Sequence, residues 1–289
     1  MKSFLATFSF FIISILADAQ SYQSRLKFEQ GQKLSITTSI KTHISQQAMG
    51  QAIDFDADGE AVHFYTVTNA TDENSTLRHQ LSQIGFNFDG MGQKRSFHST
   101  NEKDMNGQLG QSFKPLLENK YDMIIDPSGN VLLVQPEKIE IQADERMKLI
   151  SGMLKDMFTA LQPPKKGGGC LFRILPVGEI TVGKTWTDST KTETGFCNTN
   201  YIINNITDTT IVVDVNGNGH TEEASQMMGM DVLTKLDHKF TGQVIIDKTT
   251  GLIREKKIVK DSVGNSEAMG GNLPVNSKTT IKISVKPGE

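Results

Sequence analysis

The stretch GEITVGKTW at residues 178–186 contains the residue types of a phosphate-binding loop. It fits the pattern G-x-x-x-x-G-K-[ST], in which backbone amides and the start of a helix bind the phosphates of a nucleotide. That chemistry needs a helix that begins at Lys184 and Thr185. The residues from Thr185 onward, TWTDSTKTET, have poor helix propensity and good strand propensity. We therefore predict a turn at Val182–Lys184 and a strand from Trp186, and we expect neither nucleotide binding nor a catalytic site.

Two acidic stretches, Asp54–Gly59 and Asp214–Gly219, imitate the first half of a calcium-binding loop. Each has oxygen-bearing side chains at positions 1, 3 and 5 and glycine at position 6, but Tyr65 and Ser225 stand where position 12 needs a glutamate. Both stretches lie between segments typical of strands, so we predict plain hairpin turns. We expect no metal site and no cofactor. The six histidines, which also lack a metal-binding spacing, are His43, His63, His79, His98, His220 and His238.

The first nineteen residues have the form of a secretory signal peptide. Lys2 supplies the positive start, the run FLATFSFFIISIL is apolar, and Ala17–Ala19 is a small-x-small cleavage site before Gln20. A retained anchor, which is one alternative, would need about 20 apolar residues, and the other alternative is a buried helix. We expect cleavage between Ala19 and Gln20, which leaves 289 − 19 = 270 residues for a periplasmic or extracellular protein.

The chain contains two cysteines, Cys170 and Cys197. An exported chain meets an oxidising compartment, where an even pair of cysteines usually closes. We therefore predict a disulfide between them, which would stabilise the fold by roughly 3 kcal/mol. The alternative is two free thiols.

The charge balance of the chain excludes some partners. With 30 basic and 33 acidic residues and a net charge of −3, the sequence has no electrostatic footprint for nucleic acid or for an anionic membrane. No segment after the signal peptide is apolar over a transmembrane length.

Alternating polar and apolar residues predict that the chain is mainly β. In residues 34–45 (LSITTSIKTHIS) the isoleucines share one parity with two threonines between them, and the other polar side chains share the opposite parity. Residues 281–286 repeat the alternation. A period of two over this length is typical of strands with one buried and one wet face, as in antiparallel sheets. Further strands are predicted at residues 61–68, 76–88, 121–125, 131–135, 244–246 and 252–260.

Two similar hairpins and two similar strands indicate an internal repeat. Asp126–Asn130 and Asp247–Gly251 are predicted turns, and Tyr65–Asp72 matches Tyr201–Asp208 in Tyr, Asn, Thr and Asp at equal offsets. We predict an N-terminal β meander at residues 20–136 and a related C-terminal meander at residues 170–289. Residues 137–169 form a helical insert and a Gly-rich linker between them.

The insert contains the one helix that we predict, with Asp144 as its cap and Pro163 as its stop. Methionine adapts to varied apolar ligands, so the Met-rich face of this helix is a candidate ligand contact. The alternative is that this face fills the core. The candidate ligand-contact residues are Met147, Met153, Leu154, Met157 and Phe158. Residues 90–112, rich in Gly, Gln, Ser and Asn, are predicted to form a long loop or a poorly ordered excursion.

Several short motifs resemble an exported bacterial family catalogued as domain of unknown function 6263. Ile174-Leu175-Pro176 and Val182–Trp186 are similar to its signature LP…V-x-V-G-[DK]-x-W. Gln47–Gln51, Asp126–Gly129 and Gly242 with Asp247–Gly251 resemble further parts of it. The family has Gly-Asp-Ser-Trp where this chain has Gly-Lys-Thr-Trp, which creates the nucleotide look-alike. The resemblance implies no activity and no site residues.

These observations combine into one expectation for the whole chain. The fold class is mainly β, with antiparallel meanders in two related halves that form curved sheets or a half-barrel, and one central α-helix. At fold level this is similar to periplasmic half-barrel lipoprotein carriers. We expect an exported, non-catalytic binding or carrier module for an apolar small molecule or lipid. The alternative is a structural or interaction protein that contacts other envelope proteins, and a nucleotide-dependent enzyme is the least favoured function.

Overall fold

The computed structural model describes residues 21–48, 51–90, 92–139, 158–159, 161–227, 230–268 and 271–288. The predicted signal peptide with Ala19 and Gln20 lies outside these residues. So does most of the predicted helix, including Met147, Met153, Leu154 and Met157. No helix within the described ranges is long and apolar enough to cross a membrane.

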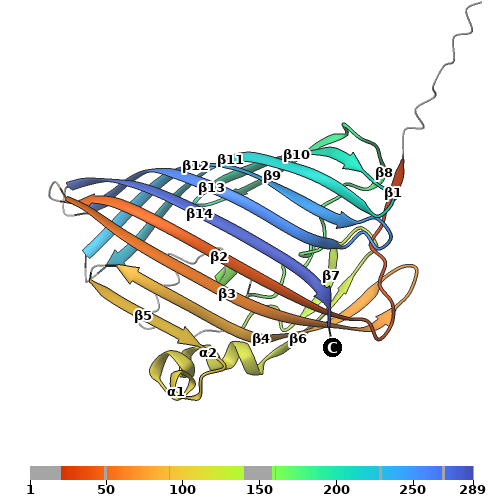
Figure 1. Cartoon of the computed structure of the whole chain (residues 1–289), viewed down its shortest axis with the longest axis horizontal. Coiled ribbons are helices and arrows are strands. Elements are labelled where there is room, and N and C mark those ends of the chain that lie inside the picture. Colours follow the sequence, from red (N-terminus) through yellow and green to blue (C-terminus); the bar gives the residue numbers. More distant parts are fainter. Residues whose placement is uncertain are drawn as a thin grey trace, which may run out of the picture.

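One strongly curved antiparallel sheet makes up most of the described chain (Figure 1). Its strand order is β7-β6-β4-β3-β2-β14-β13-β12-β11-β10-β9, and β5 pairs with β4 outside this path. The strands of the first half are β2 (Lys33–Ala48), β3 (Gln51–Ala70), β4 (Ser75–Gly90), β5 (Gln93–His98), β6 (Lys120–Ile125) and β7 (Val131–Gln135). Those of the second half are β9 (Thr185–Thr192), β10 (Gly195–Ile206), β11 (Thr210–Met227), β12 (Met230–Asp247), β13 (Ile253–Ala268) and β14 (Gly271–Pro287).

The predicted alternation explains why these strands form and which way they face. On β2, Leu34, Ile36 and Ile40 are at most 4% exposed, while Ser35, Thr37 and Ser39 on the other face meet solvent more. We call the face that carries such buried side chains the inner face of the sheet. The fold class is therefore confirmed as mainly β, with antiparallel strands that form a curved sheet.

The two halves of the chain join at β2 and β14. These strands pair directly, with Ile40 opposite Ile281 and Ile36 opposite Val285 on the inner face. Both meanders thus continue into a single sheet. The buried apolar residues still divide into two clusters, one around Phe172 mainly beneath the strands of the first half, and one around Val213 beneath those of the second half.

The predicted similarity of the halves extends to the hydrogen bonds of their turns. The hydroxyl of Thr71 accepts from the amide of Asn74 at 3.1 Å, and that of Thr207 accepts from the amide of Thr210 at 2.9 Å. The carboxylate of Asp126 accepts two backbone amides in the turn before β7, and that of Asp247 does the same before β13. Equivalent residues therefore build equivalent turns.

The segment of residues 22–32, which we call the strap, crosses the end of the sheet that carries these turns. Its strand β1 (Tyr22–Ser24) pairs with β8 (Gly178–Ile180) in a separate two-stranded sheet. The amide of Leu26 then donates to the carbonyl of Pro127, and the amide of Lys27 donates to that of Thr250, both at 2.8 Å. Adjacent strap residues therefore connect the two equivalent aspartate turns. We call the end of the sheet that carries these turns the strap end. The opposite end, where Met227 pairs with Met230, is the tip end.

The prediction of a long loop at residues 90–112 is wrong. This segment contains β5, which pairs with β4, then α1 (Glu102–Met105), which contacts β5, and the first part of α2 (Gln108–Glu118), which packs beside β4 (Figure 1). The Asn101 side chain caps α1 by accepting the amide of Lys103 at 2.9 Å. Phe113 and Leu116 on α2 are 0% and 1% exposed, so this short amphipathic helix is stabilised by packing that its polar composition concealed.

The predicted turns at Asp54–Gly59 and Asp214–Gly219 are also wrong. Both stretches lie inside long strands, β3 and β11. Along β3, Phe55 and Ala57 are 9% and 3% exposed on the inner face, while the aspartates between them point outward. The alternation of acid and small or apolar residues is therefore a strand pattern, because period two places all carboxylates on one face.

Candidate functional site

The nucleotide-like stretch forms a turn followed by a strand, as predicted. Residues 182–183 are a turn, and β9 begins at Thr185 instead of a helix. The amide of Gly183 donates to the carbonyl of Ile203 at 2.8 Å, and the amide of Ile203 donates back to the carbonyl of Lys184 at 2.9 Å. The Lys184 ammonium donates to the carbonyl of Glu179. Turn and sheet bonds thus replace the converging amides that a phosphate would need.

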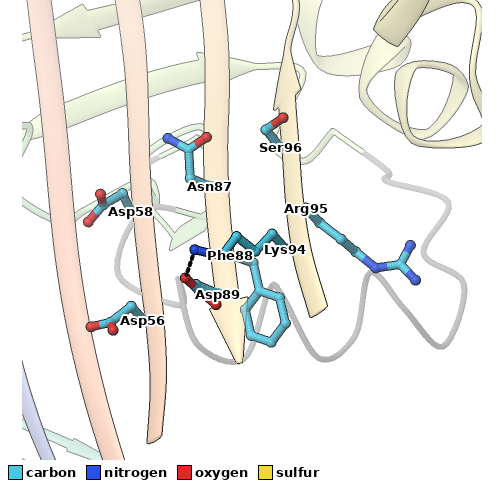
Figure 2. Close-up of a pocket in the computed structure, with 8 residues that line it drawn as sticks. All are labelled: Asp56, Asp58, Asn87, Phe88, Asp89, Lys94, Arg95 and Ser96. Carbon is cyan, nitrogen blue, oxygen red and sulfur yellow. Dashed lines mark ion pairs between the residues drawn. The ribbon is translucent and has the colours of Figure 1, made fainter. Parts of the chain in front are cut away.

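A hollow of about 380 Å³ opens on the outer face of β3, β4 and β5 (Figure 2). Its carboxylates each face a basic side chain. Asp56 lies 2.9 Å from the Nδ1 of His43, and Asp89 lies 2.7 Å from the Nζ of Lys94. Asp58 lies 3.8 Å from the Nζ of Lys41. The charges of the hollow are therefore balanced within the chain, which makes it a weak candidate for a bound cation.

A cluster of polar aromatic side chains is buried beneath the first half of the sheet. The Nδ1 of His63 lies 2.9 Å from the Nε2 of His79, and the hydroxyls of Tyr65 and Tyr121 are 3.1 Å apart. The rings of His79 and Tyr121 stack with centroids 4.2 Å apart. All four side chains are at most 5% exposed, and they come from β3, β4 and β6. The sequence analysis considered both histidines, but no local pattern indicates that their side chains are in contact.

Burial sets the titration of this cluster. It lowers the pKa of His63 to about 4, and together with the neighbouring His63 it lowers the pKa of His79 to about 3. Burial also raises the pKa of Tyr121 to about 12 and that of Tyr65 well above its ordinary value. Near neutral pH the cluster is therefore uncharged, and it packs as a polar part of the core.

The predicted disulfide between Cys170 and Cys197 does not form, and both thiols are free. Cys170 is 5% exposed and belongs to the apolar cluster of the first half, where burial raises its pKa to about 11. Cys197 is exposed on β10, opposite Gly219 of β11. The prediction rested on an even cysteine count, which carries no information about where in the fold each cysteine lies.

The inner face changes character between the two ends of the sheet. Toward the strap end it carries Val213, Val244 and Ile246, each 0% exposed. Toward the tip end it carries hydroxyls and a histidine that bond across strands. The ring of His238 lies 2.9 Å from the hydroxyl of Thr221 on β11 and 2.8 Å from that of Ser262 on β13. Two more hydroxyl pairs bond at this end, Thr234 with Ser266 at 2.8 Å and Thr42 with Thr279 at 3.2 Å.

Aromatic rings stand on both sides of these hydroxyls. Phe55 and Phe88 in the first half have ring centroids 6.4 Å apart and lie against Gly90, where an added Cβ would come within 2.7 Å of the Phe55 ring. In the second half Phe240 lies against Gly217, where an added Cβ would be 2.3 Å from its ring. Glycine is needed at both positions because the rings lie against the backbone there.

Of the predicted ligand-contact residues, only Phe158 lies within the described part of the chain. It is half-buried, and its ring stacks on that of Phe113 in α2 with centroids 5.8 Å apart. Its role as a ligand contact stays a prediction. The sequence analysis did not predict polar side chains on the inner face. The threonines between the isoleucines of residues 34–45 indicated them, because they share the parity of the buried side chains.

Several solved structures are similar to this chain at low sequence identity. Lipovitellin, from a structure titled for its lipid–protein interactions, has a TM-score of 0.47 and 10% identity, and the match covers 91% of this chain and 26% of that one. The chain thus spans about a quarter of lipovitellin. An outer-membrane channel from Pseudomonas putida F1 has a TM-score of 0.23 and 8% identity, over 90% and 97% of the two chains. The β domain of the Bordetella autotransporter BrkA has a TM-score of 0.25 and 8% identity, over 88% and 99%.

No curated protein matches the sequence. The sequence profile of one family, described as a family of unknown function (DUF6263), matches residues 72–253. This range contains the Ile174-Leu175-Pro176 and Val182–Trp186 motifs and more than half of the chain. The protein therefore belongs to the family of unknown function DUF6263.

Proposed function

We propose that this protein is an exported, non-catalytic binding or carrier module that holds an apolar ligand or lipid against the inner face of its curved sheet. The observation that carries the proposal is the incomplete burial of apolar inner-face side chains toward the tip end. Leu236, Phe240 and Ile281 share the parity of buried neighbours, yet each is only half-buried. Ile44 on β2 is half-buried as well.

The complete burial of inner-face side chains at the strap end supports the proposal that a ligand binds toward the tip end. There the inner-face side chains Ile211, Val213 and Ile246 are 0% exposed, because the strap end is packed by residues around Ile174 and Ile180. Burying the remaining accessible surface of three or four large apolar side chains would contribute about 25 cal/mol per Å². A concave surface that combines apolar side chains with a few polar groups is the usual form of a small-molecule site.

The proposal is tested by extracting the purified mature protein with organic solvent and identifying co-purified lipids by mass spectrometry. The extracted protein is then titrated with the neutral fluorescent probe 1-aminoanthracene. We expect saturable binding with a blue-shifted emission. An absence of both co-purified lipid and saturable probe binding would overturn the proposal.

Two neighbouring positions on β12 provide a matched comparison. Phe240 lies on the inner face and Thr241 on the outer face. We expect Phe240→Ser to weaken probe binding and Thr241→Ser to leave it unchanged. Urea unfolding of both variants shows whether a change in binding follows from a loss of folded protein.

A second candidate function is an interaction with other envelope proteins through the outer face. Val263 is 60% exposed and Phe196 is 42% exposed on that face. Both belong to one row across the sheet, in which Phe196 pairs with His220, His220 with Asp237, and Asp237 with Val263. A variant with Val263→Ser and Phe196→Ser should lose its partners in a pull-down from envelope fractions while it keeps probe binding.

A further inference from the structure

β11 contains four residues in mid-strand that disfavour a strand. Asn216, Gly217, Asn218 and Gly219 pair with β10 on one side and with β12 on the other. The glycines lie on the inner face, where Gly217 makes room for the ring of Phe240. The two asparagines point outward and are exposed, so packing does not explain them. Residues that weaken a strand without serving its packing are typical of a functional surface.

The outer face of β9, β10 and β11 continues these asparagines into two rows of uncharged polar side chains. The first row is Thr187, Asn200 and Asn216, and the second row is Ser189, Asn198 and Asn218. Two residues along each strand separate the rows, which is about 7 Å. We call these six side chains the amide patch. All of them are exposed except that of Asn198, which is half-buried, so a ligand can reach both rows.

The two rows of the amide patch differ in their hydrogen bonds. In the first row the hydroxyl of Thr187 donates to the Oδ1 of Asn200 at 2.9 Å, and the Nδ2 of Asn200 donates to the Oδ1 of Asn216 at 3.4 Å. The three side chains of the second row make no hydrogen bond within the part of the chain that the structure describes. Each carboxamide has one acceptor oxygen and two N–H donors. The second row therefore offers donors and acceptors side by side to a ligand.

A pair of aromatic rings borders the second row. The ring of Phe196 stacks on that of His220 with centroids 6.3 Å apart, and Phe196 is 42% exposed. The Nδ1 of His220 lies 2.8 Å from a carboxylate oxygen of Asp237, which orients the imidazole. Phe196 and Asn198 are two residues apart on the outer face of β10, which is about 7 Å. Aromatic anchors beside asparagine and serine are the composition of adaptable binding surfaces.

The charges around the amide patch favour a neutral ligand. The patch itself has no charged side chain, and the charged neighbours on its border, two basic and two acidic, are Lys191, Lys239, Asp214 and Asp237. Nucleic acid needs a basic surface, and a calcium ion needs several carboxylate oxygens. The core of a protein interface is enriched in aromatic residues, Met and Arg and is depleted in serine. A polyhydroxylated molecule, in contrast, matches uncharged donors and acceptors beside an aromatic ring.

We infer that the amide patch, with Phe196 beside it, binds a neutral glycan chain. The ring of Phe196 packs against the C–H face of one sugar, and the second-row carboxamides of Asn198 and Asn218 hydrogen-bond to sugar hydroxyls. The three side chains of a row span roughly 10 Å across the sheet, so a row can contact more than one sugar. This site goes beyond the proposed function, because it lies on the opposite face of the sheet from the apolar ligand.

The test titrates the full mature protein with hexasaccharides by isothermal titration calorimetry. Chitohexaose has N-acetylated sugars, as the glycan of bacterial cell walls does, cellohexaose and mannohexaose are plain neutral glycans, and hexagalacturonate is anionic. We expect saturable binding of at least one neutral probe and none of hexagalacturonate. The affinity should be equal at low and high salt, because no charge takes part. Preference for chitohexaose or for a plain glycan distinguishes a cell-wall source from another source.

A double variant, Asn198→Ala with Asn218→Ala, removes the carboxamides of the second row. We expect it to bind the neutral probe about tenfold or more weakly, which is the size of losing two hydrogen bonds, and to keep its urea-unfolding midpoint. The matched control is Asn265→Ala with Asn272→Ala, which removes two exposed outer-face asparagines from β13 and β14. The control should change neither the affinity nor the midpoint.

Three results would overturn the glycan site. The first is that no neutral probe binds saturably to the native protein. The second is that the second-row variant binds as tightly as the native protein, or that the affinity falls as salt is added. The third is that the second-row variant loses envelope-protein partners although the native protein binds no glycan, since the amide patch would then be a protein interface.

Discussion

The Nδ1 of His63 lies 2.9 Å from the Nε2 of His79 inside the core of the first half. One of these nitrogens donates and the other accepts, so the pair is stable only while at least one ring is neutral. The second nitrogen of His79, its Nδ1, is buried and has no hydrogen-bond partner among the described residues. The two imidazoles therefore depend on each other, and among the described residues no carboxylate contributes to the pKa shift of either one.

This pair should make the protein sensitive to mild acid. Burial holds the pKa of His63 near about 4 and that of His79 near about 3, whereas both are near 6.5 in the unfolded chain. The unfolded state thus binds more protons below pH 6.5. The stability contributed by the neutral pair is full above that pH and is lost as the pH falls through the folded values. We expect the free energy of unfolding to fall by up to about 1.4 kcal/mol per pH unit for each histidine, measured by urea unfolding.

A double variant isolates the two histidines. His63→Leu with His79→Phe should flatten the dependence between about pH 6.5 and 5.5, a window in which ordinary carboxylates remain mostly ionised. His98→Gln is the control, because His98 is exposed on β5 and should keep the native slope. An unchanged slope in the double variant would show that other groups govern acid sensitivity.

The two cysteines should differ in reactivity. Cys197 is exposed, whereas Cys170 is buried with a pKa raised to about 11, so its reactive thiolate is scarce. We expect a thiol reagent to label Cys197 alone in the folded protein without reductant, and to label both after unfolding. Peptide mapping identifies the sites. An unfolded, unreduced protein that resists labelling would instead indicate the disulfide.

In the nucleotide-like stretch, substitution of Gly183 should lower the stability of the protein more than substitution of Lys184. Gly183 has φ = +83°, and an added Cβ would meet no atom within 4 Å, so Gly183→Ala introduces only backbone strain of about 1–2 kcal/mol. Lys184→Ala removes an exposed side-chain contact and should change stability by about 0.5 kcal/mol or less. Urea unfolding checks both. Titration with a fluorescent ATP analogue should show no binding to the native protein, and binding that Lys184→Ala abolishes would contradict the assigned turn.

The strap should contribute measurable stability through its contact with the second aspartate turn. Gly251 has φ = +73°, and an added Cβ would lie 2.5 Å from the carbonyl oxygen of Arg25. Gly167 has φ = +80° and no atom within 4 Å of such a Cβ. Both alanine variants introduce the same backbone strain, but only Gly251→Ala displaces the strap. We expect it to lower the free energy of unfolding by roughly 1–2 kcal/mol more than Gly167→Ala does. Equal losses would mean that the strap adds little.

Local periodicity was enough to predict most strands of this protein. The alternation in residues 34–45 and 281–286 located parts of β2 and β14, and the Asp126 and Asp247 turns were predicted with the strands beside them. Each of these features depends on neighbours within a few residues, through pleat geometry and side-chain-to-amide bonds. The same reasoning failed at Asp54–Gly59 and Asp214–Gly219, because turn-forming residues are also compatible with a long strand whose outer face is polar.

Only the tertiary structure decided which distant residues meet. The pairing of β2 with β14, the contact of His63 with His79 and the separation of Cys170 from Cys197 all depend on strand order and register, which no local pattern encodes. α2 was hidden for the same reason, since its stability comes from packing Phe113 against the sheet. Lys260, Thr279 and Thr42 come from three strands and stand opposite one another on the inner face, and a register shift by one residue would have placed these side chains on the outer face.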